Sequence, residues 1–265
     1  MPVIKGLEWT FDTATAAYDK FRPGYVAELY GQIFDYIPMG PESQALEIGI
    51  GAGQATLPVL QTGCQLTAVE YGARFSELCR EKFKAFPKFS VITGKFEESQ
   101  LEKDTYDLAF SATAFHWIPE EAGYSKVYDV LKSGGVFARF ANRPFRDKGN
   151  PALSQEIDRI YGEYYYSFHN RKQETPREFT EEDAKKLADL AEKYGFVDIQ
   201  YAMFHRVRTF TAKEYVALLG TYSDHIAIDE PIRLAFFAKI EEAIERHGGV
   251  MNIYDTIDLQ LARKP

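Results

Sequence analysis

Residues 45–56 read Ala45-Leu46-Glu47-Ile48-Gly49-Ile50-Gly51-Ala52-Gly53-Gln54-Ala55-Thr56, and this stretch decides the fold. Apolar residues on both sides of Glu47 predict a buried strand, and three glycines at alternate positions predict a tight turn after it. Glycine brings backbone N–H groups close to a ligand, and the start of a helix adds unpaired N–H donors and a positive dipole end. The stretch therefore predicts a strand, a ligand-binding turn and a helix, with an ordinary glycine turn as the alternative.

The spacing of the glycines distinguishes two classes of nucleotide site. A dinucleotide fingerprint has the pattern Gly-x-Gly-x-x-Gly, whereas this turn has Gly-x-Gly-x-Gly, with Gln54 at the place of the last fingerprint glycine. With Glu47 two residues before the first glycine, the turn resembles motif I of the class I S-adenosylmethionine-dependent methyltransferases. The resemblance implies S-adenosylmethionine as the cofactor. It also implies that the methionine end of the cofactor is held by Glu47, Gly49, Gly51, Gly53, Gln54 and Thr56.

Strand and helix patterns alternate along the chain beyond this turn, as in parallel βαβ units. Apolar or alternating runs predict strands at 44–48, 65–70, 89–93, 106–110, 136–141, 197–210 and 251–262. Helical spacing of apolar residues predicts helices at 25–37, 52–60, 74–86, 120–131, 152–168, 180–195, 211–219 and 232–246. We therefore expect an α/β fold: a Rossmann-like, seven-stranded, mostly parallel sheet with helices on both faces and an antiparallel last strand.

Some segments depart from this alternation. Residues 1–24 read as an irregular aromatic arm, and residues 142–180 form more than a simple strand-to-helix connection. Within that segment Thr180, followed by three acids, predicts the N-cap of a helix. Further helices at 211–247 precede the last strand. We expect a single domain over residues 1–265, in which the arm and helical cap insertions at about 142–180 and 211–247 surround one sheet.

Composition limits the partners. The 265 residues carry a formal net charge of −8, whereas a nucleic-acid-binding protein usually has a basic stripe, so we expect neither a nucleic-acid nor a membrane partner. The two cysteines form no CxxC pair and the five histidines lack metal-ligand spacing, so no metal is expected. The first residues lack the apolar core of a secretion signal, and no run reaches the roughly 18 apolar residues of a membrane span. A cytoplasmic monomer or homodimer is the expectation.

Side chains at the ends of the second and third strands are candidates for the nucleoside. Glu70 ends the second strand, where a carboxylate can accept hydrogen bonds from both ribose hydroxyls, and Tyr71 beside it could pack on adenine. The methyltransferase resemblance implies that role for Glu70. It also implies an adenine-contacting pair after the third strand, here Phe96 and Glu97, although the usual Asp of that family is missing. A solvated strand end and a surface turn are the alternatives.

The loop after the fourth strand, Ser111-Ala112-Thr113-Ala114-Phe115-His116-Trp117, lies where open α/β sheets bind ligands. It resembles the Ala-x-x-His-Trp signature of small-molecule methyltransferases related to trans-aconitate methyltransferase, in the broad methyltransferase type 11 group. The lead-in Tyr18-x-x-x-Arg22-Pro23-x-Tyr25 resembles the lead-in of the same group. This match covers about residues 18–141. It implies that Ser111, Ala112 and His116 lie in the cofactor site, with His116 and Trp117 near the methyl group.

Each remaining candidate has a functional and a structural interpretation. His116 is the candidate catalytic residue, as a substrate-orienting group or a general base, because the ordinary pKa of histidine is about 6.5. Tyr18 could close over the cofactor, and Arg22 could pair with a carboxylate of the cofactor or of the substrate. Packing or capping is the alternative for all three. For the acceptor the candidates are Trp9, Trp117, Arg143, Tyr165 and Tyr222, each of which could instead pack or be solvated.

These features favour an S-adenosylmethionine-dependent methyltransferase that acts on a small-molecule acceptor, at a carboxylate or hydroxyl oxygen. A catalytically silent cofactor-binding or interaction protein is the first alternative, because an intact glycine turn does not establish turnover. An NAD(P)-binding oxidoreductase is disfavoured by Gln54 and by the absence of a Tyr-x-x-x-Lys pair placed for hydride transfer. A nucleic-acid methyltransferase is disfavoured by the net charge and by the lack of an Asn-Pro-Pro-Tyr-like motif after the fourth strand.

Overall fold

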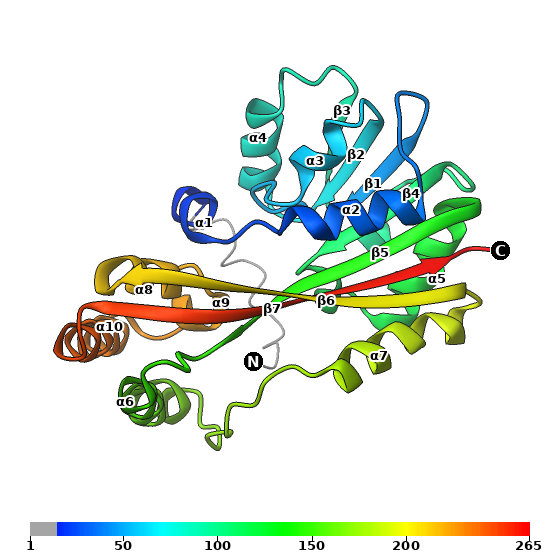
Figure 1. Cartoon of the computed structure of the whole chain (residues 1–265). Helices are drawn as coiled ribbons and strands as arrows, with labels where there is room; N and C mark the ends of the chain where they lie inside the picture. The colour runs from blue at the N-terminus through cyan, green and yellow to red at the C-terminus, as the bar shows by residue number, and fades with distance from the viewer. Residues whose placement is uncertain (1–14) are drawn as a thin grey trace.

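One sheet of seven strands runs through the part of the chain that the computed structural model describes, residues 15–265 (Figure 1). The strand order is β3-β2-β1-β4-β5-β7-β6. The bounds are β1 Gln44–Ile48, β2 Gln65–Glu70, β3 Phe89–Thr93, β4 Tyr106–Ala112, β5 Leu131–Phe145, β6 Val197–Thr211 and β7 Val250–Arg263. β7 is antiparallel to both of its neighbours, β5 and β6, and the other neighbouring strands of the sheet are parallel. The predicted α/β fold, with seven mostly parallel strands and an antiparallel last strand, is confirmed.

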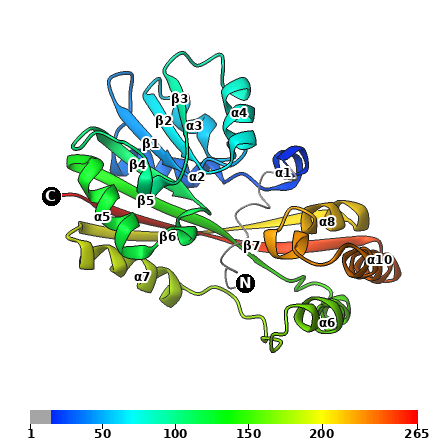
Figure 2. The same cartoon turned by 180° about the vertical axis from the view of Figure 1, so that it is seen from behind.

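Helices cover both faces of the sheet (Figure 2). Successive residues of a strand point to opposite faces, so Ala45 of β1 packs on one face while Leu46 and Ile48 pack on the other. The first face lies under α2 Ala27–Tyr36, α3 Thr56–Leu60 and α4 Ala73–Lys82. The second lies under α5 Glu120–Val130 and the 3-10 turn Leu190–Tyr194 that follows α7 Glu181–Asp189. Glu47 follows the alternation and points to the first face, toward α3.

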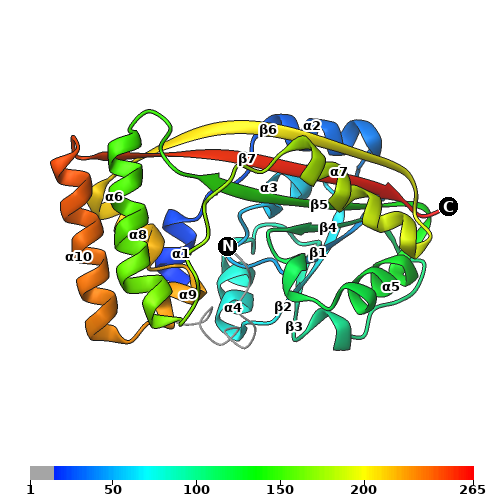
Figure 3. The same cartoon turned by 90° about the horizontal axis from the view of Figure 1, so that it is seen from below.

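The strands β5, β6 and β7 extend beyond the others and carry a second group of helices (Figure 3). We call it the helical cluster; its members are α6 Pro151–Tyr161, the π-helix Gly162–Tyr166, α8 Ala212–Leu219, α9 Ser223–Ile226 and α10 Glu230–Arg246. The cluster has an apolar core of its own, to which Met251 and Ile253 of β7 contribute. Helix α1, Thr15–Phe21, lies against α8. The arm therefore meets the helical cluster beside the first face of the sheet.

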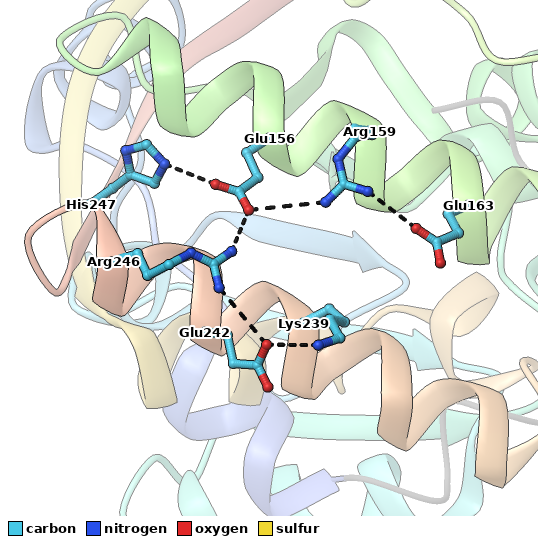
Figure 4. Close-up of polar contacts among 7 residues, drawn as sticks. All are labelled: Glu156, Arg159, Glu163, Lys239, Glu242, Arg246 and His247. Atoms are coloured by element: carbon cyan, nitrogen blue, oxygen red, sulfur yellow. Dashed lines mark hydrogen bonds and ion pairs between the residues drawn. The ribbon is translucent and has the colours of Figure 1, made fainter.

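Ion pairs join α6 to the end of α10 on the surface of the helical cluster (Figure 4). Glu156 of α6 is paired with Arg246 and accepts a 2.9 Å hydrogen bond from His247 Nε2. Arg246 also reaches Glu242 at 3.9 Å, which in turn pairs with Lys239 at 2.8 Å. Exposed pairs of this kind contribute on the order of 0–1 kcal/mol each, so the apolar core between the helices, rather than these pairs, holds the cluster together.

The predicted N-cap at Thr180 is confirmed, but three predicted elements are wrong in extent. Residues 15–21 of the arm are helical because α1 packs against α8, a tertiary contact that local sequence does not reveal. The helix expected from residue 52 begins at Thr56, since Gly53 has a positive φ that an α-helix does not admit. The fifth strand runs over 131–145 rather than 136–141, because pairing with β7 continues as far as Phe145. The capping box of α7 joins Thr180 and Asp183.

Candidate functional site

The glycine turn between β1 and α3 is the centre of the candidate site. Gly49, Gly51 and Gly53 have φ of +73°, +55° and +78°, a left-handed region that side chains disfavour. A Cβ on Gly49 would lie 2.5 Å from the Cβ of Ala114, and one on Gly53 would lie 2.5 Å from the ring of Phe83. Glycine is therefore required at positions 49 and 53 by packing as well as by backbone conformation.

Gly51 differs from its two neighbours because it faces the arm. A Cβ on Gly51 would meet only the side chains of Tyr18 and Gln54, at 3.7 and 3.8 Å. The Tyr18 ring is held edge-on by Phe75 of α4, with ring centroids 5.0 Å apart. The arm and the turn thus approach each other at Gly51, the one glycine of the three at which a side chain would not collide with the core.

Glu47 lies beneath the turn and is 1% exposed. The hydroxyl of Thr56, the first residue of α3, donates a 2.8 Å hydrogen bond to Oε2 of Glu47. Burial raises the pKa of Glu47 to about 8. Among the described residues, Oε1 of Glu47 has no hydrogen-bond partner, and neither has the buried Nε2 of Gln54. A buried polar atom without a partner costs free energy, so these two atoms indicate a ligand with a donor and an acceptor.

Glu70 connects the turn after β1 with the turn after β2. Its Oε2 accepts a 2.8 Å hydrogen bond from the amide of Gly51, and its Oε1 accepts one of 2.8 Å from the amide of Gly72. The carboxylate is almost fully buried and fixed at the carboxyl edge of the sheet. Tyr71, the next residue, is 50% exposed. Glu70 therefore lies against the glycine turn, and its role toward ribose and that of Tyr71 toward adenine stay predictions.

Arg22 joins the arm to the helical cluster. Its Nε and Nη2 each donate a 2.9 Å hydrogen bond to Thr221, one to Oγ1 and one to the carbonyl oxygen. The guanidinium lies 4.8 Å from the ring centroid of Tyr18 and 4.1 Å from that of Tyr222. Arg22 thus ties Tyr18, which faces the glycine turn, to Tyr222 of the helical cluster.

The end of β4 carries a strained residue. Thr113 has a φ of +55°, which is a genuine outlier for a β-branched side chain and is typical of functional loops. Its Oγ1 lies 2.6 Å from the hydroxyl of Tyr25 and accepts a 3.2 Å hydrogen bond from the amide of Asn142. The ring of Tyr25 packs edge-on against Phe140 at 4.8 Å. These bonds connect the end of β4 with Tyr25, the first residue after the arm, and with β5.

Two predicted cofactor residues precede Thr113 on β4. Ser111 is fully buried, and its hydroxyl donates a 2.8 Å hydrogen bond to the carbonyl of Ile48. It therefore joins the ends of β4 and β1 next to the glycine turn. Ala112 is partly buried at the last position of β4. Both residues lie at the carboxyl edge of the sheet. The hydroxyl of Ser111 already has a hydrogen-bond partner in the backbone.

His116 stands in the 3-10 turn Phe115–Trp117 after β4. Its ring is exposed, yet enough protein surrounds it to lower its pKa to about 4, with the nearby Arg143, Arg139 and Arg22 as further causes. His116 is thus neutral at ordinary pH and lies among positive charges.

Arg143 and Trp117 are two predicted acceptor residues that lie near His116. Arg143 Nε donates a 2.7 Å hydrogen bond to Oδ1 of Asp258, a buried residue of β7, and its guanidinium lies 4.8 Å from the ring centroid of Phe179. The Trp117 ring is partly buried, with its centroid 5.4 Å from that of His116. The ion pair with Asp258 fixes the place of the Arg143 charge.

Two other predicted residues, Phe96 and Tyr165, are buried in apolar cores. Phe96 is buried in the core of the second face, and Glu97 beside it is partly buried. Tyr165 is buried in the helical cluster, where its hydroxyl donates a 2.7 Å hydrogen bond to Asp224. The rings of Phe96 and Tyr165 therefore take part in packing. Trp9 lies outside the described residues.

Sequence reasoning missed a set of charged residues on β6 and β7. Arg206 and Arg208 both pair with Asp255, which has no exposed side-chain surface. Two arginines two residues apart share one face of a strand, and this spacing between Phe204 and Phe210 was a usable signal. The convergence on Asp255 also requires the β6–β7 register, which pairs Arg206 with Asp255, and a single sequence does not show that register.

The comparisons with known proteins identify the domain built around this turn. Residues 46–138, from β1 to β5, match the family described as "Methyltransferase domain". The chain carries a class I S-adenosylmethionine-dependent methyltransferase domain. S-adenosylmethionine is its cofactor. Within residues 15–265, no helix of this methyltransferase is long and apolar enough to cross a membrane, and no three His, Cys, Asp or Glu side chains gather as metal ligands would.

Two relatives of the methyltransferase from fission yeast cover more than nine-tenths of its length. An uncharacterised methyltransferase-like protein of Schizosaccharomyces pombe is 26% identical over 244 residues, which are 92% of this chain and 89% of the relative. A solved structure assigned as a type II methyltransferase of Anaeromyxobacter dehalogenans superposes with a TM-score of 0.62 at 20% identity and covers 92% of this chain and 98% of that one.

A longer protein, phosphoethanolamine N-methyltransferase 2 of Haemonchus contortus, was solved with phosphomonomethylethanolamine and S-adenosylhomocysteine. It superposes with a TM-score of 0.56 at 16% identity; the alignment covers 100% of this chain and 61% of that one. Identities this low show a common fold and nothing about the acceptor.

Proposed function

We propose that this methyltransferase moves the methyl group of S-adenosylmethionine to an oxygen, carboxylate or hydroxyl, of a small-molecule acceptor. The acceptor would bind beside His116, between the arm, the end of β4 and the helical cluster. The observation that carries the proposal is the pair of buried atoms without partners at the glycine turn, Glu47 Oε1 and Gln54 Nε2. The arm (residues 1–24) and the insertions at 142–180 and 211–247 would then act as the cap of one domain.

The residues at the turn fit the methionine end of the cofactor. An ionised Glu47 would accept hydrogen bonds from an ammonium group, and Gln54 Nε2 would donate to a carboxylate. Glu70, bound to the amide of Gly51, would accept from ribose hydroxyls, Tyr18 lies next to Gly51, and the exposed Tyr71 would offer its ring to adenine. When bound, S-adenosylmethionine supplies an electrophilic methyl group on a sulfonium.

The remaining residues would bind and orient the acceptor. Methyl transfer depends on an in-line approach of the acceptor oxygen and on exclusion of water, so positioning supplies much of the rate. The lowered pKa of His116, about 4, keeps its ring neutral and makes it a weak base. It is therefore suited to orient an acceptor by a hydrogen bond, and a carboxylate acceptor, which is ionised at neutral pH, requires no base at all.

A methyl-transfer assay tests the proposed function directly. Incubating the protein with methyl-labelled S-adenosylmethionine and separate panels of small carboxylic acids, phenols and amines is expected to label members of the acid or hydroxyl panels. Mass spectrometry of the product shows which atom carries the methyl. Label on amines alone would contradict transfer to oxygen. Binding of S-adenosylhomocysteine without label in any panel would favour the catalytically silent alternative.

We expect His116→Ala to lower kcat about tenfold to a hundredfold, because a positioning hydrogen bond to the acceptor is lost. The affinity for S-adenosylhomocysteine, measured by calorimetry, should not change. His205→Ala is the matched control, since that histidine is exposed on β6. If kcat of the His116→Ala variant equals that of the wild type, His116 is a structural residue.

A further inference from the structure

The cluster of Arg206, Arg208 and Asp255 contains two positive charges and one negative charge. Asp255 is buried, and both arginines are mostly buried, with 23% and 14% of their side chains exposed. Two guanidinium groups against one carboxylate leave one net positive charge in this part of the molecule. Uncompensated buried charge is costly, so the cluster is expected to serve a ligand or a partner group of opposite sign.

Arg206 uses its donors within the protein. Its Nε and Nη2 donate to Oδ2 of Asp255 at 3.3 and 3.1 Å, Nη2 also donates to Oδ1 of Asn142 at 2.7 Å, and Nη1 donates to the carbonyl of Gly24 at 3.0 Å. The backbone N–H of Asn142 in turn donates a hydrogen bond to Oγ1 of Thr113. A continuous chain of hydrogen bonds therefore leads from the end of β4 to Asp255.

Arg208 stands at the far end of this chain with one side of its guanidinium unused. Nε and Nη2 donate to the two carboxylate oxygens of Asp255, at 2.5 and 2.9 Å. The third nitrogen, Nη1, is buried and has no hydrogen-bond partner among the described residues. A guanidinium held on one edge by a bidentate carboxylate presents its remaining donors in a fixed direction.

The surroundings of Arg208 belong to the proposed acceptor site. Arg22 and Arg208 both act on the half-buried Tyr222, where each positive charge opposes the rise in its pKa that burial causes. The Arg22 guanidinium lies against the Tyr222 ring and contacts Tyr18, which faces the glycine turn. The Arg208 guanidinium lies 5.0 Å from the ring centroid of Phe210, and Phe210 and Tyr222 both pack against the apolar core of the helical cluster. Arg208 therefore lies beside the helical cluster, as Tyr222 does.

From this geometry we propose that Arg208 Nη1 is an anchor for an anionic group, a carboxylate or a phosphate, carried by the acceptor at a distance from the oxygen that receives the methyl. This inference rests on the proposed function, because it names the substrate class of the same site. The anchor would let the methyltransferase select acidic acceptors and would hold them in one orientation along the chain of hydrogen bonds from Arg208 to Thr113. The anionic end of the acceptor, rather than the oxygen that receives the methyl group, would then determine specificity.

The experiment uses the full chain saturated with S-adenosylhomocysteine and two probes, inorganic phosphate and acetate, titrated by calorimetry. We expect at least one probe to bind the wild type and to bind Arg208→Gln about tenfold to a hundredfold more weakly, as for the loss of a charged hydrogen bond. Arg208→Lys keeps the positive charge but loses the planar set of guanidinium donors, so its affinity for the ions should lie between those of the wild type and Arg208→Gln. Lys213→Gln, which removes an exposed charge from α8, is the matched control and should bind as the wild type does.

Each outcome decides the inference. Preference for phosphate assigns a phosphorylated acceptor, and preference for acetate assigns a carboxylic acid. The inference is wrong if neither ion binds the wild-type complex, or if both Arg208 variants bind the ions as the wild type does. If Arg208→Gln does not fold, the Arg208→Lys variant decides alone. If the wild type does not bind S-adenosylhomocysteine at all, the proposed function is wrong. Failure of the proposed function is therefore distinguishable from failure of the Arg208 inference.

Discussion

Replacing Gly51 by arginine is expected to abolish binding of S-adenosylhomocysteine, measured by calorimetry, while the protein stays folded. The Cβ of a new side chain would lie 3.7 Å from the Tyr18 ring and 3.8 Å from Gln54, with no core atom closer. An arginine side chain would thus occupy the space between the glycine turn and the arm, where the cofactor is proposed to lie. Its cation would also oppose any positive charge on the ligand.

The control for Gly51→Arg must separate occupation of the site from backbone strain. Gly51 has a φ of +55°, and a side chain in that region costs on the order of 1–2 kcal/mol. Gly134 has a φ of +80° and no atom within 4 Å of its missing Cβ. Gly134→Arg therefore introduces the same charge and a similar strain in an open place, and it should bind S-adenosylhomocysteine normally. If Gly51→Arg still binds S-adenosylhomocysteine, the assignment of the cofactor to this turn is wrong.

Much of the sheet could be predicted from the sequence because its signals are local. The run around Glu47, the glycines after it and the alternation of strands with amphipathic helices are each readable within a few residues. The antiparallel last strand was likewise expected, and β7 is antiparallel to both β5 and β6. The length of β5 was not predicted, because its last residues become a strand only by pairing with β7.

The candidate site was predictable at the glycine turn and less so elsewhere. Glu47, Gln54 and Glu70 each contact a residue of the stretch 51–56, and their roles toward the cofactor stay predictions. The positive φ of Thr113 leaves no trace in the sequence, because β-branched residues rarely adopt it. Tyr165, one of the candidates for the acceptor, is buried, and its hydroxyl donates to Asp224. One sequence does not tell which face of a helix meets a cluster and which meets a ligand.

Glu47 should make cofactor binding strongly dependent on pH. Burial raises its pKa to about 8 in the ligand-free protein, so at pH 7 only about a tenth of the molecules carry the negative charge. If the ammonium of the ligand binds the ionised carboxylate, binding must release a proton. The affinity for S-adenosylhomocysteine should then rise about tenfold per pH unit from pH 6 toward pH 8 and level off above it.

The Glu47→Gln variant provides the comparison. Its amide keeps an oxygen that can accept from Thr56 but does not ionise, so the variant should bind more weakly above pH 8 and should lack the component of the slope that belongs to Glu47. Taking the difference between wild type and variant removes the titration of the ligand itself. Equal slopes for the two proteins would show that the carboxylate does not carry the binding.

The same titration has an opposite effect on the ligand-free fold. A carboxyl whose pKa is raised from 4.5 when unfolded to about 8 when folded binds more protons in the folded state between these values, so its contribution to the free energy of unfolding is lost as pH rises. Ligand-free wild type should therefore lose stability relative to Glu47→Gln between pH 5 and pH 8, in urea unfolding followed by circular dichroism. Saturating S-adenosylhomocysteine should narrow that difference, because the ammonium compensates the buried charge. Affinity and ligand-free stability would then change in opposite directions over one pH range, as expected when a binding group is held uncharged until its ligand arrives.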